Sequence, residues 1–141
     1  MMNIKFSFII IDDAELDLYV TQKFLERINK DLIIKTFQSA GEALELIREN
    51  TQEDAQLPTI ILLDMQMPVM NGFKFVEEFE NLPTEIKKNY VIIILTILSA
   101  TSNPNDIYRI LNYKSVNSII EKPLTKEKLF SLLNQLESSI N

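Results

Sequence analysis

Runs of large apolar residues alternate with amphipathic segments along the whole chain. Five of these runs are rich in β-branched and aromatic residues, a composition that favours strands. The expected strands are Phe6–Ile11, Leu32–Phe37, Thr59–Asp64, Tyr90–Leu98 and Val116–Ile120. The third run holds four consecutive large aliphatic residues, which is typical of a strand covered on both faces of a parallel sheet.

Each expected strand is followed by a segment whose apolar residues recur at helical spacing. The expected helices are Ala14 to about Asn29, Ser39–Arg48, Gly72–Glu80, a helix opened by Asn103-Pro104, and Leu124 to about Ser138. Local signals agree: Ser39 and Glu42 match a capping box, Pro104 suits a first helical position, and Thr125 suits an N-cap. Strict alternation predicts an α/β fold with a doubly wound, five-stranded parallel sheet covered by helices on both faces.

The length of the chain sets the expected domain count. With 141 residues, 46% of them hydrophobic, the chain is long enough for one domain with a full core and too short for two typical ones. The polar stretch Thr51–Pro58 predicts a surface loop, and no internal repeat is visible. We therefore expect a single domain over residues 1–141 with no separate output domain.

Composition excludes several classes of function. A net charge of −6 disfavours nucleic-acid binding, which requires an excess of Lys and Arg. The longest apolar stretch, Tyr90–Leu98, is about half of the roughly 20 residues that a membrane span needs, and the N-terminus has no signal segment. We expect a cytoplasmic protein. Because the chain has no cysteine and no histidine, thiol chemistry, histidine-based triads and histidine or cysteine zinc sites are excluded.

Carboxylates follow two of the apolar runs. Asp12-Asp13 comes directly after the first strand, and Asp64 ends the third. Parallel strands bring their carboxyl ends to one edge of the sheet, where open α/β sheets bind ligands. Three neighbouring negative charges repel one another, and a divalent cation that prefers oxygen ligands would relieve that repulsion.

Each of these residues also has a simpler interpretation. An Asp at a strand end, such as Asp64, is often a helix N-cap or part of an Asx-turn. Asp13 alone could cap the first helix, with Asp12 merely exposed. Lys122, which precedes Pro123 after the fifth strand, could be a solvated turn residue. The cluster of Glu77, Glu78 and Glu80 is most simply a solvated helix face.

Taken in order, these motifs resemble the receiver domain of two-component response regulators, and the resemblance covers the chain almost end to end. The matching pieces are Asp12-Asp13, Asp64, Met67-Pro68 with Asn71-Gly72, a hydroxyl residue after the fourth strand, and Lys122-Pro123. Each motif is short and unspecific alone, whereas the whole series at successive strand ends is specific. The resemblance implies a flavodoxin-like fold with strand order 2-1-3-4-5.

The resemblance also implies a role for each residue at that edge. Asp64 would accept a phosphoryl group from a histidine kinase or a His-containing phosphotransfer protein. Asp13, Asp64 and the backbone carbonyl of Gln66 would bind Mg²⁺, and Asp12 would assist, directly or through water. Lys122 would contact the transferring phosphoryl oxygens. The resemblance further implies a protein that is not an enzyme towards other molecules and whose chemistry is limited to Mg²⁺-dependent self-phosphorylation and self-dephosphorylation.

Two positions are structural by this resemblance, and one is ambiguous. Pro123 would follow a cis peptide bond, and Gly72 would allow the loop before it to turn sharply into a helix. The phosphoryl-binding hydroxyl is either Ser99 or Thr96. We favour Ser99, because a small residue follows it and it lies nearer the helix start at Pro104.

One departure from the family pattern concerns the output. Many members carry Tyr or Phe three residues before the lysine as a conformational switch, and here that position is Ile119. We expect signalling by protein contact through the helix opened by Pro104, the fifth strand and the last helix. One alternative is an interaction module that needs no phosphate. Another is a phosphohydrolase, which Gln66 disfavours because such enzymes typically carry Asp two residues after the nucleophile.

Overall fold

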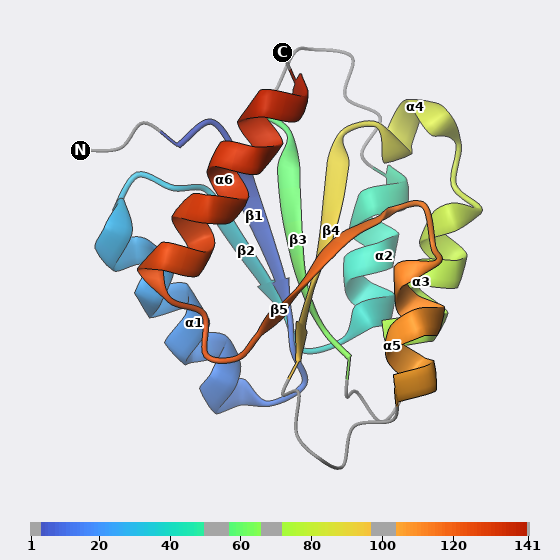
Figure 1. Cartoon of the computed structure of the whole chain (residues 1–141), viewed down its shortest axis with the longest axis horizontal. Helices are drawn as coiled ribbons and strands as arrows, with labels where there is room; N and C mark the ends of the chain where they lie inside the picture. Colours follow the sequence, from blue (N-terminus) through green and yellow to red (C-terminus); the bar gives the residue numbers. More distant parts are fainter. Residues whose placement is uncertain (1–3, 50–56, 66–71, 97–103, 141) are drawn as a thin grey trace.

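A computed structural model of the chain describes residues 4–49, 57–65, 72–96 and 104–140. Within these ranges there are five strands and six helices; one helix follows each strand, except that two follow the third strand (Figure 1). The strands are β1 (Ser7–Ile11), β2 (Ile34–Phe37), β3 (Thr59–Asp64), β4 (Tyr90–Thr96) and β5 (Val116–Glu121). The helices are α1 (Glu15–Ile28), α2 (Ala40–Glu49), α3 (Gly72–Glu80), α4 (Thr84–Lys87), α5 (Pro104–Leu111) and α6 (Lys126–Ile140).

All five strands run parallel in one sheet of order β2-β1-β3-β4-β5. This arrangement confirms the predicted doubly wound fold and its strand order. The strand bounds differ slightly from the prediction, since β1 begins at Ser7 and β2 at Ile34. Positions 97 and 98, which we expected at the end of the fourth strand, lie outside the described residues.

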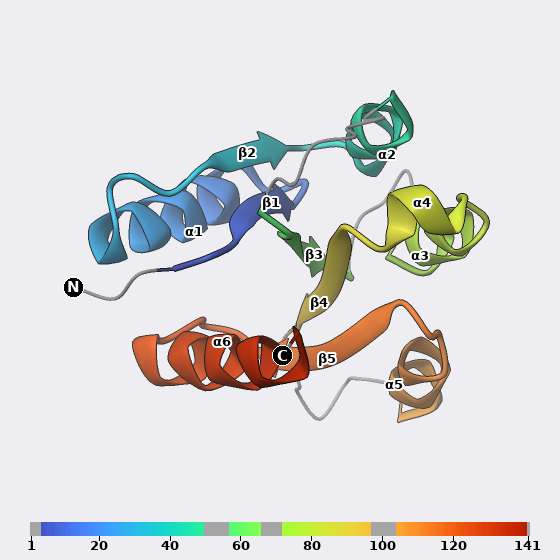
Figure 2. The same cartoon turned by 90° about the horizontal axis from the view of Figure 1, so that it is seen from above.

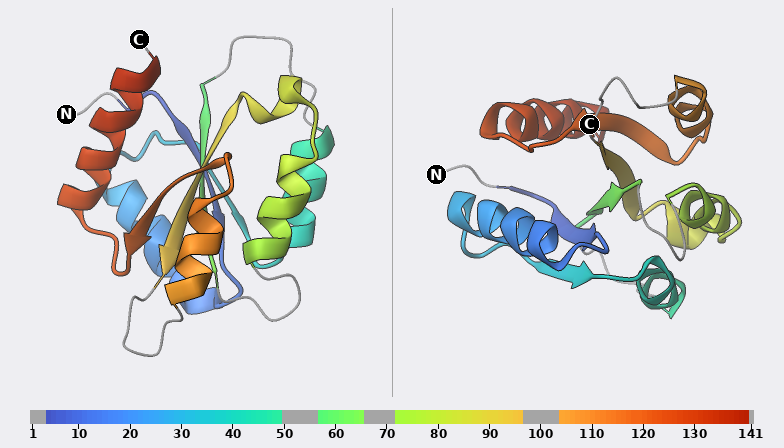
Figure 3. Two further views of the ribbon diagram at one scale, coloured as in Figure 1. Left: turned by 45° about the vertical axis from the view of Figure 1, so that its right-hand side comes forward. Right: turned by 90° about the horizontal axis from the view of Figure 1, so that it is seen from below.

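Alternate residues of the central strands enter two separate cores, one on each face of the sheet. Helices α1 and α6 cover one face, and α2, α3 and α5 cover the other (Figures 2 and 3). Even-numbered β1 residues such as Phe8 and Ile10 pack with α1 and α6, whereas Ile9 and Ile11 pack with α2, α3 and α5. Burial on both faces explains the uninterrupted aliphatic runs of the sequence.

The helix starts match the local sequence signals. The backbone N–H of Glu42 donates to the Ser39 hydroxyl at 3.4 Å, and that of Lys128 donates to the Thr125 hydroxyl at 3.2 Å. Pro104 is the first residue of α5. The short helix α4 was not predicted, because its four residues contain only one apolar side chain and therefore show no periodicity.

Candidate functional site

The register of the central strands places two carboxylates side by side at the carboxyl edge of the sheet. Ile11 pairs with Leu63 in the parallel ladder, so Asp12 and Asp64, one residue further along, lie level with each other. Asp12 is 4% exposed and Asp64 is 7% exposed, whereas Asp13 is exposed to solvent. One oxygen from each of these three carboxylates lies within 4.8 Å of the other two. The predicted convergence of the three side chains is confirmed.

Both oxygens of Asp12 have partners. Oδ1 accepts the backbone N–H of Ala14 at 3.0 Å, and Oδ2 lies 3.3 Å from the Nζ of Lys122. Burial raises the pKa of Asp12, and the Asp64 charge adds to this effect, while the Ala14 N–H and Lys122 oppose it. The alternative in which Asp12 is exposed is wrong, and no side chain caps α1, whose N-cap residue is Ala14.

Lys122 brings a positive charge to the carboxylates. Its Nζ lies 3.3 Å from Asp12 Oδ2, 3.5 Å from Asp64 Oδ1 and 3.8 Å from Asp17 Oδ2, and its side chain is only 21% exposed. Burial by itself lowers the pKa of Lys122, but attraction to Asp64 and Asp12 outweighs this and raises the pKa above its usual value. Lys122 is therefore a site residue rather than a solvated turn residue.

The backbone around Lys122 is tied to the neighbouring strand. The backbone N–H of Lys122 donates to the Thr96 carbonyl at 2.7 Å, which extends the β4–β5 ladder to the site. The Lys122–Pro123 peptide bond is cis, as the family resemblance implied. Thr96 is 6% exposed at the end of β4, one residue beyond the Asp64–Leu95 pair. Its competitor Ser99 lies outside the described residues, as does Gln66.

Gly72 is the first residue of α3, and the structure requires glycine there for a different reason from the one predicted. Its φ angle is not positive, so no unusual backbone conformation requires glycine. Instead, a Cβ at this buried position would lie 3.1 Å from the Cα of Met65. The Gly72 N–H also donates to the Met65 carbonyl at 3.3 Å. Close backbone approach therefore explains the glycine and holds the start of α3 against the end of β3.

The donor set fits a hard divalent cation. Three carboxylates with neighbouring oxygens are the ligand type that Mg²⁺ prefers, and Asp13 leaves the site open to water on one side. Lys122 balances part of the negative charge at Asp12 and Asp64 in the absence of a cation. The arrangement thus combines three carboxylates, two of them buried, with an ammonium group held beside them.

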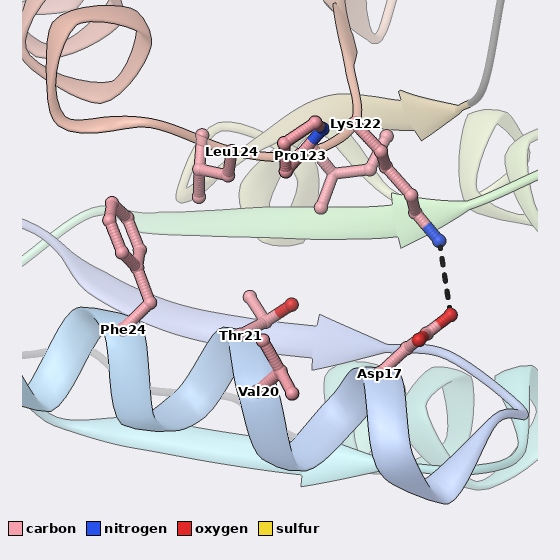
Figure 4. A pocket seen from close by; sticks show the side chains of 8 residues that line it. Asp17, Val20, Thr21, Phe24, Lys122, Pro123 and Leu124 are labelled. Atoms are coloured by element: carbon pink, nitrogen blue, oxygen red, sulfur yellow. Dashed lines mark ion pairs between the residues drawn. The ribbon is translucent and has the colours of Figure 1, made fainter.

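An apolar cavity of about 420 Å³ lies beside this site, between α1 and the connection from β5 to α6 (Figure 4). Its lining residues are Asp17, Val20, Thr21, Phe24, Leu95, Lys122, Pro123 and Leu124. Asp17 and Lys122 form the charged end of the cavity, where they face each other. Asp17 was not identified from the sequence, because its place one helical turn after Asp13 does not by itself show that it reaches Lys122.

A second polar network joins α3 to α5. Glu77 accepts hydrogen bonds from Arg109 and from the Tyr113 hydroxyl, both at 2.8 Å, and the Arg109 guanidinium stacks over the Phe73 ring at 4.2 Å. The bond from Tyr113 and that from Arg109 lower the pKa of Glu77. Arg48 pairs with Glu78 in the same region. The side chains of Glu77 and Glu78 are 44% and 31% exposed, as expected of a solvated helix face, and they also form surface ion pairs with the neighbouring helices.

Ile119 occupies the position at which many family members carry an aromatic switch residue. Ile119 is half-buried on β5 and packs against the core formed with α2, α3 and α5. Among the helices of the described ranges, none has the length and apolar character that crossing a membrane requires.

Comparison with known proteins agrees with this architecture. The sequence model of the response regulator receiver domain matches residues 8–134. A crystal structure of a response regulator receiver protein from Dyadobacter fermentans is similar with a TM-score of 0.78 and 30% identity, covering 92% of this chain and 96% of that one.

Similarity extends to parts of larger proteins. The chain is 26% identical over 136 residues to the peroxide stress-activated histidine kinase mak1 of Schizosaccharomyces pombe, covering 96% of this chain and 8% of the kinase. It is 26% identical over 129 residues to the probable C4-dicarboxylate response regulator DctR of Halalkalibacterium halodurans, covering 92% of this chain. The chain spans half the length of that regulator.

Proposed function

Because this chain belongs to the response regulator receiver domain family of two-component signalling, we propose that Asp64 accepts a phosphoryl group from a partner's phosphohistidine. The observation that carries this proposal is the meeting of three carboxylates within 4.8 Å of one another, two of which also pair with the Lys122 ammonium. A bond forms between phosphorus and an Asp64 oxygen while the phosphorus–nitrogen bond of the donor breaks. The departing imidazole takes up a proton. The donor is a histidine kinase or a His-containing phosphotransfer protein, since this chain has no histidine.

The residues around Asp64 would prepare it for this transfer. Asp12, Asp13 and Asp64, with the Gln66 carbonyl, would hold Mg²⁺, which when bound neutralises charge on the phosphoryl oxygens. Asp12 accepts the Ala14 N–H, and this bond fixes the orientation of its carboxylate. Asp12 and Asp64 are shielded from solvent, whereas Asp13 faces it.

Lys122 would move its ammonium from the carboxylates to the phosphoryl oxygens. Its Nζ already lies 3.5 Å from Asp64 Oδ1, so only a small side-chain movement is needed. A hydroxyl, from Ser99 or alternatively from Thr96 at the end of β4, would donate to the same group. Thr96 lies one residue beyond the partner of Asp64 in the ladder, which supports a position close to the phosphoryl group.

The output would be a protein contact on the surface of α5, β5 and α6. Tyr108 is 72% exposed and Leu111 is 49% exposed on α5, so apolar area is available there for a partner. A second candidate function, a receiver-fold module that binds its partner without phosphate, is favoured by Ile119. An aliphatic side chain packed against the core cannot serve as the Tyr or Phe switch that many family members carry at this position.

Phosphorylation can be tested with a small phosphodonor and Mg²⁺. We expect one labelled site, sensitive to hydroxylamine as acyl phosphates are, and lost in Asp64→Asn. Asp31→Asn, which alters an exposed Asp in the turn after α1, is the matched control and should label normally. Equal labelling of Asp64→Asn and wild type would refute the assignment. Partner capture that is indifferent to phosphorylation and to Asp64→Ala would favour the phosphate-independent module.

A further inference from the structure

A fourth carboxylate competes for the lysine of the site. Asp17 projects from the first turn of α1, and its Oδ2 lies 3.8 Å from the Nζ of Lys122 (Figure 4). Its side chain is 55% exposed, whereas those of Asp12 and Asp64 are 5% and 10% exposed. The Asp17 carboxylate and the Lys122 ammonium point toward each other from α1 and from the connection between β5 and α6, at the charged end of the apolar cavity. Lys122 is thus shared among three carboxylates on three different elements.

We propose that Asp17 is a positioning residue that holds Lys122 back from the phosphoryl group and disfavours small anionic phosphodonors. This inference rests on the proposed transfer to Asp64. When Asp64 carries a phosphoryl group, Lys122 must redirect its three donors toward the new oxygens, and each carboxylate that also binds it opposes that movement. Asp12 and Asp64 belong to the reacting centre, but Asp17 has no other role there and can be removed selectively.

The negative charge of Asp17 also disfavours small anionic phosphodonors directly, by electrostatic repulsion. A small donor such as an acyl phosphate approaches as an anion, and a half-exposed carboxylate beside its path repels it. A phosphohistidine presented by a protein can bring compensating basic groups, so the repulsion discriminates between the two classes of donor. Exposed ion pairs contribute little, so removal of Asp17 should change binding by about two- to five-fold.

Binding of beryllofluoride, which stands in for the phosphoryl group, provides the test. In saturating Mg²⁺, Asp17→Asn should bind beryllofluoride about two- to five-fold more tightly than wild type, measured by titration calorimetry. Mg²⁺ alone should bind the same variant equally well or more weakly, because a nearby negative charge has been lost and Lys122 pairs more closely with Asp12 and Asp64. Asp17→Glu, which keeps the charge, should restore the wild-type behaviour.

The matched control is Glu15→Gln, which removes one negative charge from the same helical turn at a residue that makes no ion pair with Lys122 in the described structure. Equal behaviour of Asp17→Asn and Glu15→Gln would overturn the proposal, since any change would then be a general charge effect. Weaker binding of both ligands to Asp17→Asn would also overturn it and would indicate a structural role. If wild type binds no beryllofluoride, or Asp64→Asn binds it equally, the proposed transfer itself is wrong.

Discussion

Replacement of Lys122 by methionine removes the positive charge from the carboxylate site while keeping the aliphatic stem beside Pro123 and Leu124. The ammonium lies 3.3 Å from Asp12 and 3.5 Å from Asp64. At the effective dielectric constant of about 20 that suits such sites, each attraction is on the order of 5 kcal/mol before desolvation is subtracted. Loss of one partner from a fully buried pair costs about 3–5 kcal/mol.

The Lys122 side chain is 21% exposed, so water reaches part of the pair and the cost is smaller. Asp12, whose pKa is already raised by burial, can also take up a proton when the lysine is absent. We therefore expect Lys122→Met to lower the free energy of unfolding by about 1–3 kcal/mol without Mg²⁺. With urea slopes of about 2 kcal/mol per molar, the midpoint of unfolding should fall by about 1 M.

Added Mg²⁺ should reduce the difference in the free energy of unfolding between wild type and Lys122→Met. A cation at the carboxylates stabilises the folded state by about 2.7 kcal/mol at a concentration 100 times its dissociation constant. The variant lacks the competing ammonium, binds the cation more tightly and gains more. Urea melts of both proteins, in chelator and in a Mg²⁺ series, measure this directly, with Lys126→Met, an exposed lysine on α6, as the control. The reasoning would be refuted if Lys122→Met were as stable as Lys126→Met in chelator, or if its difference in stability from wild type grew with Mg²⁺.

Three further predictions concern stability. Burial raises the folded-state pKa of Asp12, so its ionised form opposes folding at neutral pH. Without Mg²⁺, Asp12→Asn should therefore be more stable than wild type at neutral pH. In urea melts, this difference in the free energy of unfolding should vanish below about pH 3.8, where Asp12 is protonated in both the folded and the unfolded state. Gly72→Val should lower stability by about 1–3 kcal/mol in urea melts, since its Cβ would meet the Met65 backbone; an unchanged midpoint would argue against this close approach. The hydrogen bonds to Glu77 lower its pKa, so their contribution is present above about pH 4.5 and disappears as pH falls through the folded-state pKa; thermal melts of Glu77→Gln should therefore differ from wild type at pH 7 and converge with it in acid.

The positions of Asp12, Asp64 and Lys122 could be predicted because each one follows or ends an apolar run. In a parallel sheet the end of every run lies at the same edge, so sequence position translates directly into spatial position. The clear boundaries of these runs also explain why β3 was predicted to the residue. No knowledge of side-chain conformations was needed for either result.

The contacts of Asp17 and Glu77 could not be predicted in this way. Asp17 meets Lys122 because a helix crosses beside the sheet edge, and that crossing depends on how α1 packs rather than on its own sequence. Glu77 is on a polar helix face, and charge pattern alone does not show that Arg109, from another helix, packs against it. The reason for Gly72 was also missed, since close backbone approach depends on the path of the chain around Met65.

The pairing of Ile11 with Leu63 has a consequence for how this chain can change length. Alternate residues of β1 and β3 enter opposite cores. An insertion of one residue within either strand would therefore turn the residues of that strand beyond the insertion toward the wrong core, or displace its carboxylate by about 3.3 Å. Insertions in the stretch 51–58 lie upstream of the paired segment and leave this alignment intact. Length variation in descendants of this sequence should therefore accumulate in that stretch and be absent between Ser7 and Asp12 and between Thr59 and Asp64.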